Sequence, residues 1–151
     1  LVWLDVPPAL PERRLSRRAD DRVSFADAYP LLLTSTASLD ALNGWLTDAG
    51  EAAVPMTRFR PNLVVDAVAA WAEDCWVGGR LRIGSVTFRA AQTCDRCVVT
   101  TVDQETGEKW RQPLQVLGQH RRFGQDLLFG LNLIPDAAGK VAVGDPVQPL
   151  P

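Results

Sequence analysis

The sequence predicts a mainly β domain of barrel-like architecture with a few short helices. Apolar and polar residues alternate over 81–90 and again over 98–102, which is the period of half-buried strands. Turn sequences rich in glycine and aspartate separate these short runs, and few stretches show helical spacing. Many short strands joined by turns, with few helices, favour a β-barrel.

The first ordered element is expected to begin near Val23. Residues 30–34 form a short apolar run that ends in a polar residue, which predicts a buried strand. Ser38 then precedes apolar residues at helical spacing, so we expect an amphipathic helix to begin there. After a loop over 50–57, the segment 58–65 is expected to enter a second strand through a proline that fixes the local backbone.

The second half of the chain predicts five more strands and one helix. The strands are expected at 81–83, 86–90, 98–102, 127–134 and 141–147. The turns between them are expected at 84–85, 103–107 and 136–139. Residues 113–119 predict one short helix with its proline in the first turn.

Length and composition predict one domain. The 151 residues, 46% of them hydrophobic, suffice for a single sizeable core. Residues 1–22 are expected to be an extended lead-in segment and residues 23–151 the domain itself. Because the first residues resemble the middle of a chain, we expect this to be the C-terminal part of a longer parent protein.

Charge and hydropathy exclude two classes of partner. The net charge of −2 disfavours a nucleic-acid binder held mainly by phosphate contacts. No apolar run approaches the roughly 18 residues that span a bilayer, and the N-terminal residues lack the order of a signal peptide. We therefore expect a cytoplasmic protein without a membrane segment.

The CxxC formed by Cys94 and Cys97 allows a redox pair, half of a zinc site or a single ligand. A redox pair usually begins a helix, but 98–102 has the sequence of a strand, which disfavours that interpretation. Zinc needs two further ligands from Cys75, His120 or carboxylates, and no second CxxC exists. If the strand continues, the two cysteines point to opposite faces, so one cysteine acts alone. That cysteine is either a thiolate that serves as a soft metal ligand or simply a small apolar residue.

Arginine and asparagine side chains recur in the segment RFRPN. If this segment is extended, Arg60 and Asn62 project to the same side, where a guanidinium and an amide suit a phosphate or a pterin edge. Arg96, beside the second cysteine, can likewise meet an anionic ligand. The alternative is a surface strand with solvated arginines. Motifs of serine hydrolases, phosphate loops and dinucleotide-binding folds are absent.

Six segments together resemble the MOSC domains, the type found at the C-terminus of molybdenum cofactor sulfurase. The segments are FADAYPLLLTSTASLDALN, RFRPNLVVD, WAEDCW, LRIGSVTFRAAQTCDRCVVTTVDQETGE, FGQD and VGDPV. They occur in the family's order, and the similarity is greatest to the branch containing the mitochondrial amidoxime-reducing component and bacterial MOSC proteins. The resemblance implies a β-barrel related to the pyruvate-kinase insert domain.

The resemblance also implies a site. It assigns Cys97, rather than Cys94, as the catalytic cysteine and the ligand of molybdenum. Other residues are implied to contact or line the pocket of the molybdenum cofactor (molybdopterin): Ala28, Tyr29, Arg60, Asn62, Asp95, Arg96 and Asp126. Asp103 lies in a matching segment without an assigned role. Pyridoxal phosphate binding is a further property that the family carries.

The activity implied by the resemblance is that of an oxidoreductase that reduces N-hydroxylated small molecules. Electrons would arrive from a separate flavin or iron–sulfur protein, and an N-terminal MOSC-associated domain of the parent chain would complete the cofactor site. Two alternatives remain. One is a sulfur-carrier domain with a persulfide on Cys97, and the other is a non-catalytic structural module of a larger enzyme.

Overall fold

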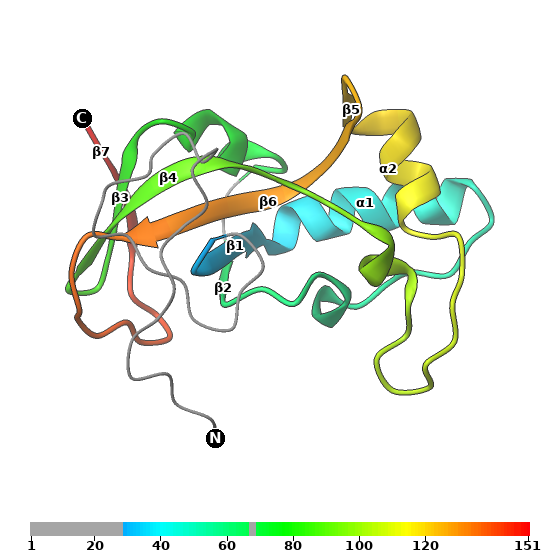
Figure 1. The fold of residues 1–151 in the computed structure, drawn as a ribbon, viewed down its shortest axis with the longest axis horizontal. Helices are drawn as coiled ribbons and strands as arrows, with labels where there is room; N and C mark the ends of the chain where they lie inside the picture. The colour runs from blue at the N-terminus through cyan, green and yellow to red at the C-terminus, as the bar shows by residue number, and fades with distance from the viewer. Residues whose placement is uncertain (1–28, 67–68) are drawn as a thin grey trace.

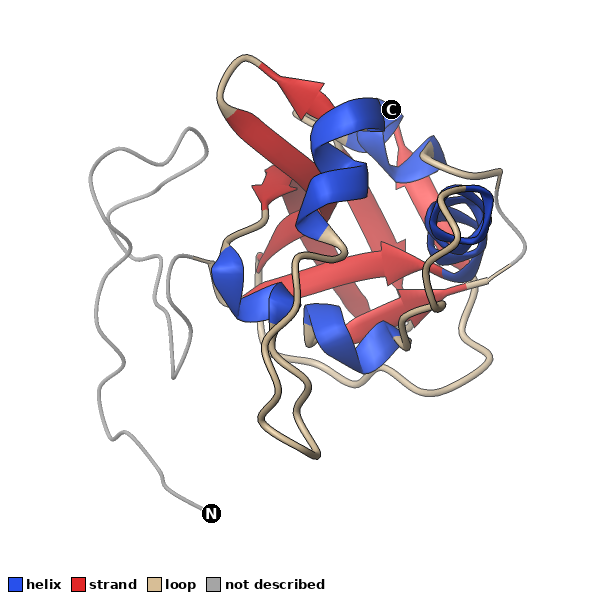
Figure 2. Cartoon of the chain, turned by 90° about the vertical axis from the view of Figure 1, so that its right-hand side faces the viewer, coloured by secondary structure: helices blue, strands red, loops and turns tan. Residues whose placement is uncertain are grey.

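The computed structural model describes residues 29–66 and 69–151, which form a curled, half-closed β-sheet flanked by helices (Figures 1 and 2). The strands are β1 Leu31–Ser35, β2 Leu63–Val65, β3 Arg80–Ile83, β4 Val86–Asp95, β5 Arg122–Phe123, β6 Asp126–Pro135 and β7 Val147–Leu150. The α-helices are α1 Thr36–Asp48 and α2 Leu114–His120. Three 3-10 helices are η1 Met56–Phe59, η2 Ala72–Trp76 and η3 Val98–Thr101. The mainly β prediction is confirmed, whereas the lead-in segment and the expected start near Val23 lie outside the described residues.

The sheet order is β2-β1-β6-β4-β3-β7, with β5 paired to β6. β1 and β2 are parallel, and the other pairs are antiparallel. The long strands β4 and β6 run side by side through the middle of the sheet (Figure 1). Their register shifts between Ala90 and Gln92 and again between Thr93 and Asp95. Such irregularities bend a strand, and here they precede the segment that contains Cys97.

β1 and α1 follow one another without a loop. β1 is buried along most of its length, as expected for an apolar run between two neighbouring strands. The backbone of Ser35 is extended, and its Oγ accepts the N–H of Ser38 at 3.1 Å, so Ser35 is the N-cap of α1. The prediction that Ser38 starts the helix was therefore wrong: its own hydroxyl is buried and accepts the N–H of Trp71.

The core has two main parts. One lies within the curled sheet, among Leu33, Leu81, Phe88, Leu131, Leu133 and their neighbours. The other lies between the sheet and the two α-helices and includes Leu42, Leu46, Phe59, Leu117 and Phe129. The rings of Phe59 and Phe129 stack with centroids 3.9 Å apart, which attaches η1 to β6.

Two predicted strands are corrected. Residues 98–101 form the 3-10 helix η3, because the hydroxyls of Thr100 and Thr101 donate to the carbonyls of Cys97 and Val98 at 3.0 and 2.7 Å. The argument against a redox pair, which assumed a strand after Cys97, therefore loses its basis. β7 begins only at Val147, because Asp145 Oδ2 accepts the N–H of Ala142 and closes a turn within 141–146.

The strands expected at 81–83, 86–90 and 127–134 and the second helix lie where they were expected, whereas the strand expected within 58–65 begins only at Leu63. β3, β4 and β6 cover the predicted runs, and Pro113 is the N-cap of α2. Over the described ranges, no helix has the length and apolar character needed to cross a bilayer.

Candidate functional site

Cys97 lies at the turn between β4 and η3, and its side chain is exposed. Both the N–H and the hydroxyl of Thr100 donate to the carbonyl of Cys97, at 3.1 and 3.0 Å. Thr100 is itself buried, so these bonds fix the backbone of the cysteine from the interior side. The turn therefore presents the thiol at the surface from an ordered backbone.

Arg96 connects this turn to two other segments. Its backbone N–H donates to the carbonyl of Leu127 at 2.8 Å, and its Nη2 donates to the carbonyl of Phe59 at 2.9 Å. Its Nη1 lies 3.0 Å from Cys94 Sγ, and its guanidinium carbon lies 5.5 Å from the centre of the Phe59 ring. Among the residues that the structure describes, Nε is buried without a hydrogen-bond partner. One N–H of a partly buried cation thus remains available for an acceptor beside Cys97.

Asp95 and Asp126 lie on the two strands that meet at this turn. Asp95 Oδ1 accepts the N–H of Leu127 at 3.0 Å, which ties the end of β4 to the start of β6. Asp126 is exposed, pairs with Phe123 of β5 and immediately precedes Leu127. The two carboxylates are therefore brought to the same end of β4 and β6 as Cys97.

Arg60 has a left-handed backbone, with φ 54° and ψ 49°, and is exposed. The expectation that Arg60 and Asn62 project together from an extended strand was wrong, because Arg60 is the left-handed C-cap of η1 and β2 begins only at Leu63. A non-glycine residue rarely adopts this conformation, and a following proline disfavours helical backbone further. Strain of this kind concentrates at functional sites, so the outlier itself marks Arg60 as a functional candidate.

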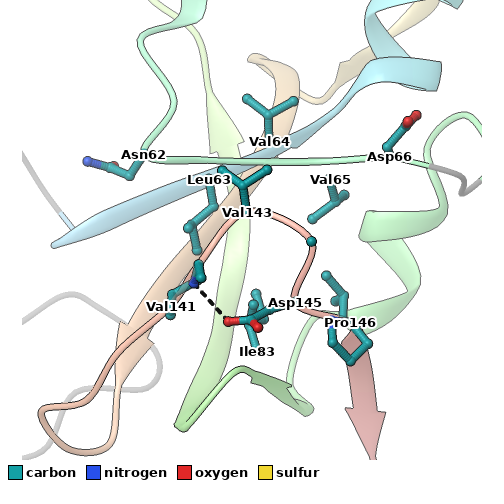
Figure 3. A pocket seen from close by; sticks show the side chains of 13 residues that line it. Asn62, Leu63, Val64, Val65, Asp66, Ile83, Val141, Val143, Asp145 and Pro146 are labelled. Atoms are coloured by element: carbon teal, nitrogen blue, oxygen red, sulfur yellow. Dashed lines mark hydrogen bonds between the residues drawn. The ribbon is translucent and has the colours of Figure 1, made fainter.

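Asn62 joins β2 to β1 through its side chain. The N–H of Leu32 donates to Asn62 Oδ1 at 2.8 Å. The amide nitrogen is turned away from the groove beside β2 (Figure 3). The oxygen of this amide has a structural partner, and the Nδ2 group is the donor left for a ligand.

Arg58 and Asp103 form an ion pair next to these residues. Arg58 Nη2 lies 2.7 Å from Asp103 Oδ2, and the arginine side chain is only 4% exposed. The backbone N–H groups of Thr106 and Glu105, followed by the charge of Arg58, lower the pKa of Asp103 below its usual value. The sequence pointed to both residues but contained no signal for their pairing, since they lie 45 positions apart.

Tyr29 lies away from the cysteine turn. It is 4% exposed, packs with Ala91 and Ile134, and donates its hydroxyl to Gln92 Oε1 at 3.2 Å. These neighbours lie further back along β4 and β6 than the end that carries Cys97. The cofactor role of Tyr29 stays a prediction, and Ala28 lies outside the described residues.

An open groove of ≈ 770 Å³ lies beside β2, between that strand and the loop 141–147 (Figure 3). Of the site residues predicted from the sequence, only Asn62 lines it among the described positions. Cys97 and Arg96 are not part of its wall. Within the described part of the chain, no three His, Cys, Asp or Glu side chains are grouped to hold a metal ion.

Comparison with known proteins identifies the family. The family model for the MOSC domain matches residues 20–148, and the chain belongs to that family. Mitochondrial amidoxime-reducing component 1 of Homo sapiens is 37% identical over 139 residues, covering 86% of this chain and 40% of the relative. Mitochondrial amidoxime reducing component 2 of Homo sapiens is 38% identical over 135 residues, covering 83% and 38%. The chain thus spans about two fifths of the length of these curated relatives.

Proposed function

We propose that this chain is the molybdenum-cofactor-binding domain of an oxidoreductase that reduces N-hydroxylated compounds, with Cys97 as the protein ligand of the metal. One observation carries the proposal: an exposed thiol on an ordered turn lies beside a guanidinium with a buried, unpaired N–H at Nε. The family match and the relatives named amidoxime-reducing components support the same reaction class.

The residues at this end of the sheet fit such a cofactor chemically. A thiolate is a soft donor suited to a heavy transition metal. The guanidinium groups of Arg60 and Arg96 suit phosphate or pterin oxygens, and Asn62 Nδ2 supplies a neutral donor. When bound, the molybdenum group would supply the redox chemistry that breaks the nitrogen–oxygen bond.

The protein side chains would bind and orient the cofactor, and their ionisation would determine which of them can donate a proton. Arg96 would hold the cofactor next to Cys97 through its free Nε, while its Nη2 stays on the Phe59 carbonyl. Because the pKa of Asp103 is lowered, this carboxylate is ionised near neutral pH and is unsuited to donate a proton.

We further propose the partners and the location. Electrons would come from a separate flavin or iron–sulfur protein, and an N-terminal MOSC-associated domain would add contacts to the cofactor. The short span of this chain relative to its relatives supports that second partner. The protein is proposed to act in the cytoplasm on a small-molecule substrate.

The test is molybdenum content, measured by elemental mass spectrometry on the full-length parent protein purified from a host that makes the cofactor. Wild type and Cys75→Ser, which replaces another exposed cysteine, should hold near-stoichiometric metal. Cys97→Ser should lose the metal while remaining folded, and the loaded wild type should reduce an N-hydroxylated amidine. A folded wild type without molybdenum, or equal metal in Cys97→Ser, would contradict the proposal.

A second candidate function is sulfur handling, favoured by the exposure of the free Cys97 thiol. In that case a persulfide-selective trapping reagent would label Cys97 in protein taken directly from cells, and molybdenum would be absent. If the chain is instead a structural module, Cys97→Ser would leave the activity of the parent enzyme unchanged.

A further inference from the structure

η1 is bound on both sides of the cysteine turn. Before the turn, Arg96 Nη2 donates to the carbonyl of Phe59 at 2.9 Å. After the turn, Gln104 Nε2 donates to the carbonyl of Thr57 at 3.0 Å, and Asp103 pairs with Arg58 at 2.7 Å. One short helix thus contacts the chain immediately before and shortly after Cys97.

Asp103 uses its two carboxylate oxygens for different purposes. Oδ1 accepts the N–H groups of Glu105 and Thr106 at 2.9 and 3.0 Å and so orders the turn that follows η3. Oδ2 accepts from Arg58. The carboxylate therefore couples the conformation of this turn to the position of η1.

Arg58 is an unfavourable residue to bury here. Its side chain is 4% exposed, and its Nη1 is buried without a hydrogen-bond partner. Its guanidinium carbon lies 5.7 Å from the centre of the Trp110 ring, in the segment after the turn. An apolar side chain of similar volume would fill the space without desolvating a cation, so stability alone gives no reason for an arginine. The directional ion pair with Asp103 gives such a reason.

We propose that Arg58 is a positioning residue of the candidate site, whose ion pair with Asp103 holds η1, and with it Arg60, against the cysteine turn. Asn62 is already fixed to β1 through Leu32, and Arg60 is held in a strained conformation. Arg60 directly follows η1, so the position of η1 determines where Arg60 lies. η1 itself is held by the bonds of Arg58, Thr57 and Phe59 to residues on both sides of the cysteine turn. The inference rests on the proposed function, because the placement of η1 beside the cysteine turn matters for holding the proposed cofactor.

The test is the alkylation rate of each cysteine in the 151-residue chain, measured with iodoacetamide and peptide mapping. Trypsin cuts after Arg96 and so separates Cys94 from Cys97. The variants are Arg58→Met, Asp103→Asn and their combination, with Arg58→Lys as the conservative change. The matched control is Arg89→Met, which removes another buried, ion-paired arginine, from the part of β4 distant from the turn.

Loss of the pair should raise the alkylation rate of Cys94 by about threefold or more, because this half-buried thiol, 3.0 Å from Arg96 Nη1, becomes fully accessible when the turn opens. Arg58→Met and Asp103→Asn should give the same increase, and the combination no more than either. Arg58→Lys should restore part of the wild-type rate. The rate at Cys75, which is exposed, should not change in any of them, and Arg89→Met should leave Cys94 at the wild-type rate.

The proposal is overturned if Cys94 reacts at the wild-type rate in Asp103→Asn, which keeps the acceptor that orders the turn and is expected to fold. It is also overturned if the two single effects add in the combination, or if Arg89→Met has the same effect. Absence of molybdenum from the wild-type parent would instead contradict the proposed function and leave this result standing. Where wild type holds the metal, Arg58→Met should reduce metal content at an unchanged melting temperature.

Discussion

Asn62 and Leu32 are joined by a reciprocal pair of hydrogen bonds. The backbone N–H of Asn62 donates to the carbonyl of Leu32 at 2.9 Å, and the N–H of Leu32 donates to Asn62 Oδ1 at 2.8 Å. The side chain therefore continues the pairing of β1 and β2 just before the first strand pair, Leu33 with Leu63. The side-chain amide of Asn62 thus has two parts: Oδ1 has a structural role, and Nδ2 is the donor available to a ligand.

Substitutions can distinguish the roles of Oδ1 and Nδ2 of Asn62. Asn62→Asp keeps an acceptor for the N–H of Leu32 and should retain most of the stability. Asn62→Leu leaves that N–H, on a buried residue, without its partner and should lower the free energy of unfolding by about 1–3 kcal/mol. Urea unfolding measures both.

Both variants lack the Nδ2 donor, so both should reduce the molybdenum content of the parent protein. Equal stability of Asn62→Asp and Asn62→Leu would show that the bond to Leu32 contributes little. Wild-type metal content in Asn62→Asp would remove Asn62 from the cofactor site.

Arg60→Gly should separate backbone strain from ligand binding. Glycine adopts a φ near 54° without steric cost, whereas alanine does not. We therefore expect Arg60→Gly to be more stable than Arg60→Ala by about 1 kcal/mol in chemical denaturation. Both should lose cofactor, because both lack the guanidinium. An Arg60→Ala variant as stable as Arg60→Gly would argue that the left-handed backbone is not strained.

The sequence predicted the elements whose form depends on local pattern. β1, β4 and β6 follow from apolar runs or alternation, and α1 follows from helical spacing, although its cap was placed three residues late. The CxxC motif and the charge beside it indicate Cys94, Cys97 and Arg96 as candidates, and the family resemblance then selects Cys97. In these cases the information lies within a few neighbouring residues.

The sequence failed where side-chain hydrogen bonds or backbone strain override the local pattern, and where contacts are distant in the chain. The run from Val98 to Val102 alternates as a strand does, yet hydroxyl-to-carbonyl bonds within it favour a 3-10 turn. The pairing of Arg58 with Asp103 spans 45 positions, and no local pattern reports it. The strained backbone of Arg60 precedes a proline, where an extended conformation is the ordinary expectation.

The lowered pKa of Asp103 predicts how stability depends on pH. A carboxyl group whose folded pKa lies below the usual 3.8 stabilises the fold fully above that pH, and the contribution disappears as pH falls through the lowered value. The difference in unfolding free energy between wild type and Asp103→Asn should therefore be constant near neutral pH and shrink below about pH 4. Equilibrium unfolding across an acid series measures it. A difference that grew toward low pH would contradict the assignment.

Gly130, the only glycine within the strands that the structure describes, should tolerate a side chain poorly. Its φ is +87°, and an added Cβ would lie 2.8 Å from the backbone oxygen of Leu33 and 3.0 Å from side-chain atoms of Leu32 and Thr34. Gly130→Ala should therefore lower the free energy of unfolding by about 2–4 kcal/mol, from strain and from displacement of β1. Gly44→Ala is the matched control: nothing lies within 4 Å of its Cβ, and in the interior of α1 it should stabilise by about 0.5–1 kcal/mol. Because β1 connects β6 to β2, Gly130→Ala should also shift the position of Asn62 and reduce metal content. A Gly130→Ala variant as stable as wild type would mean that β1 and β6 are further apart in solution than these contacts require.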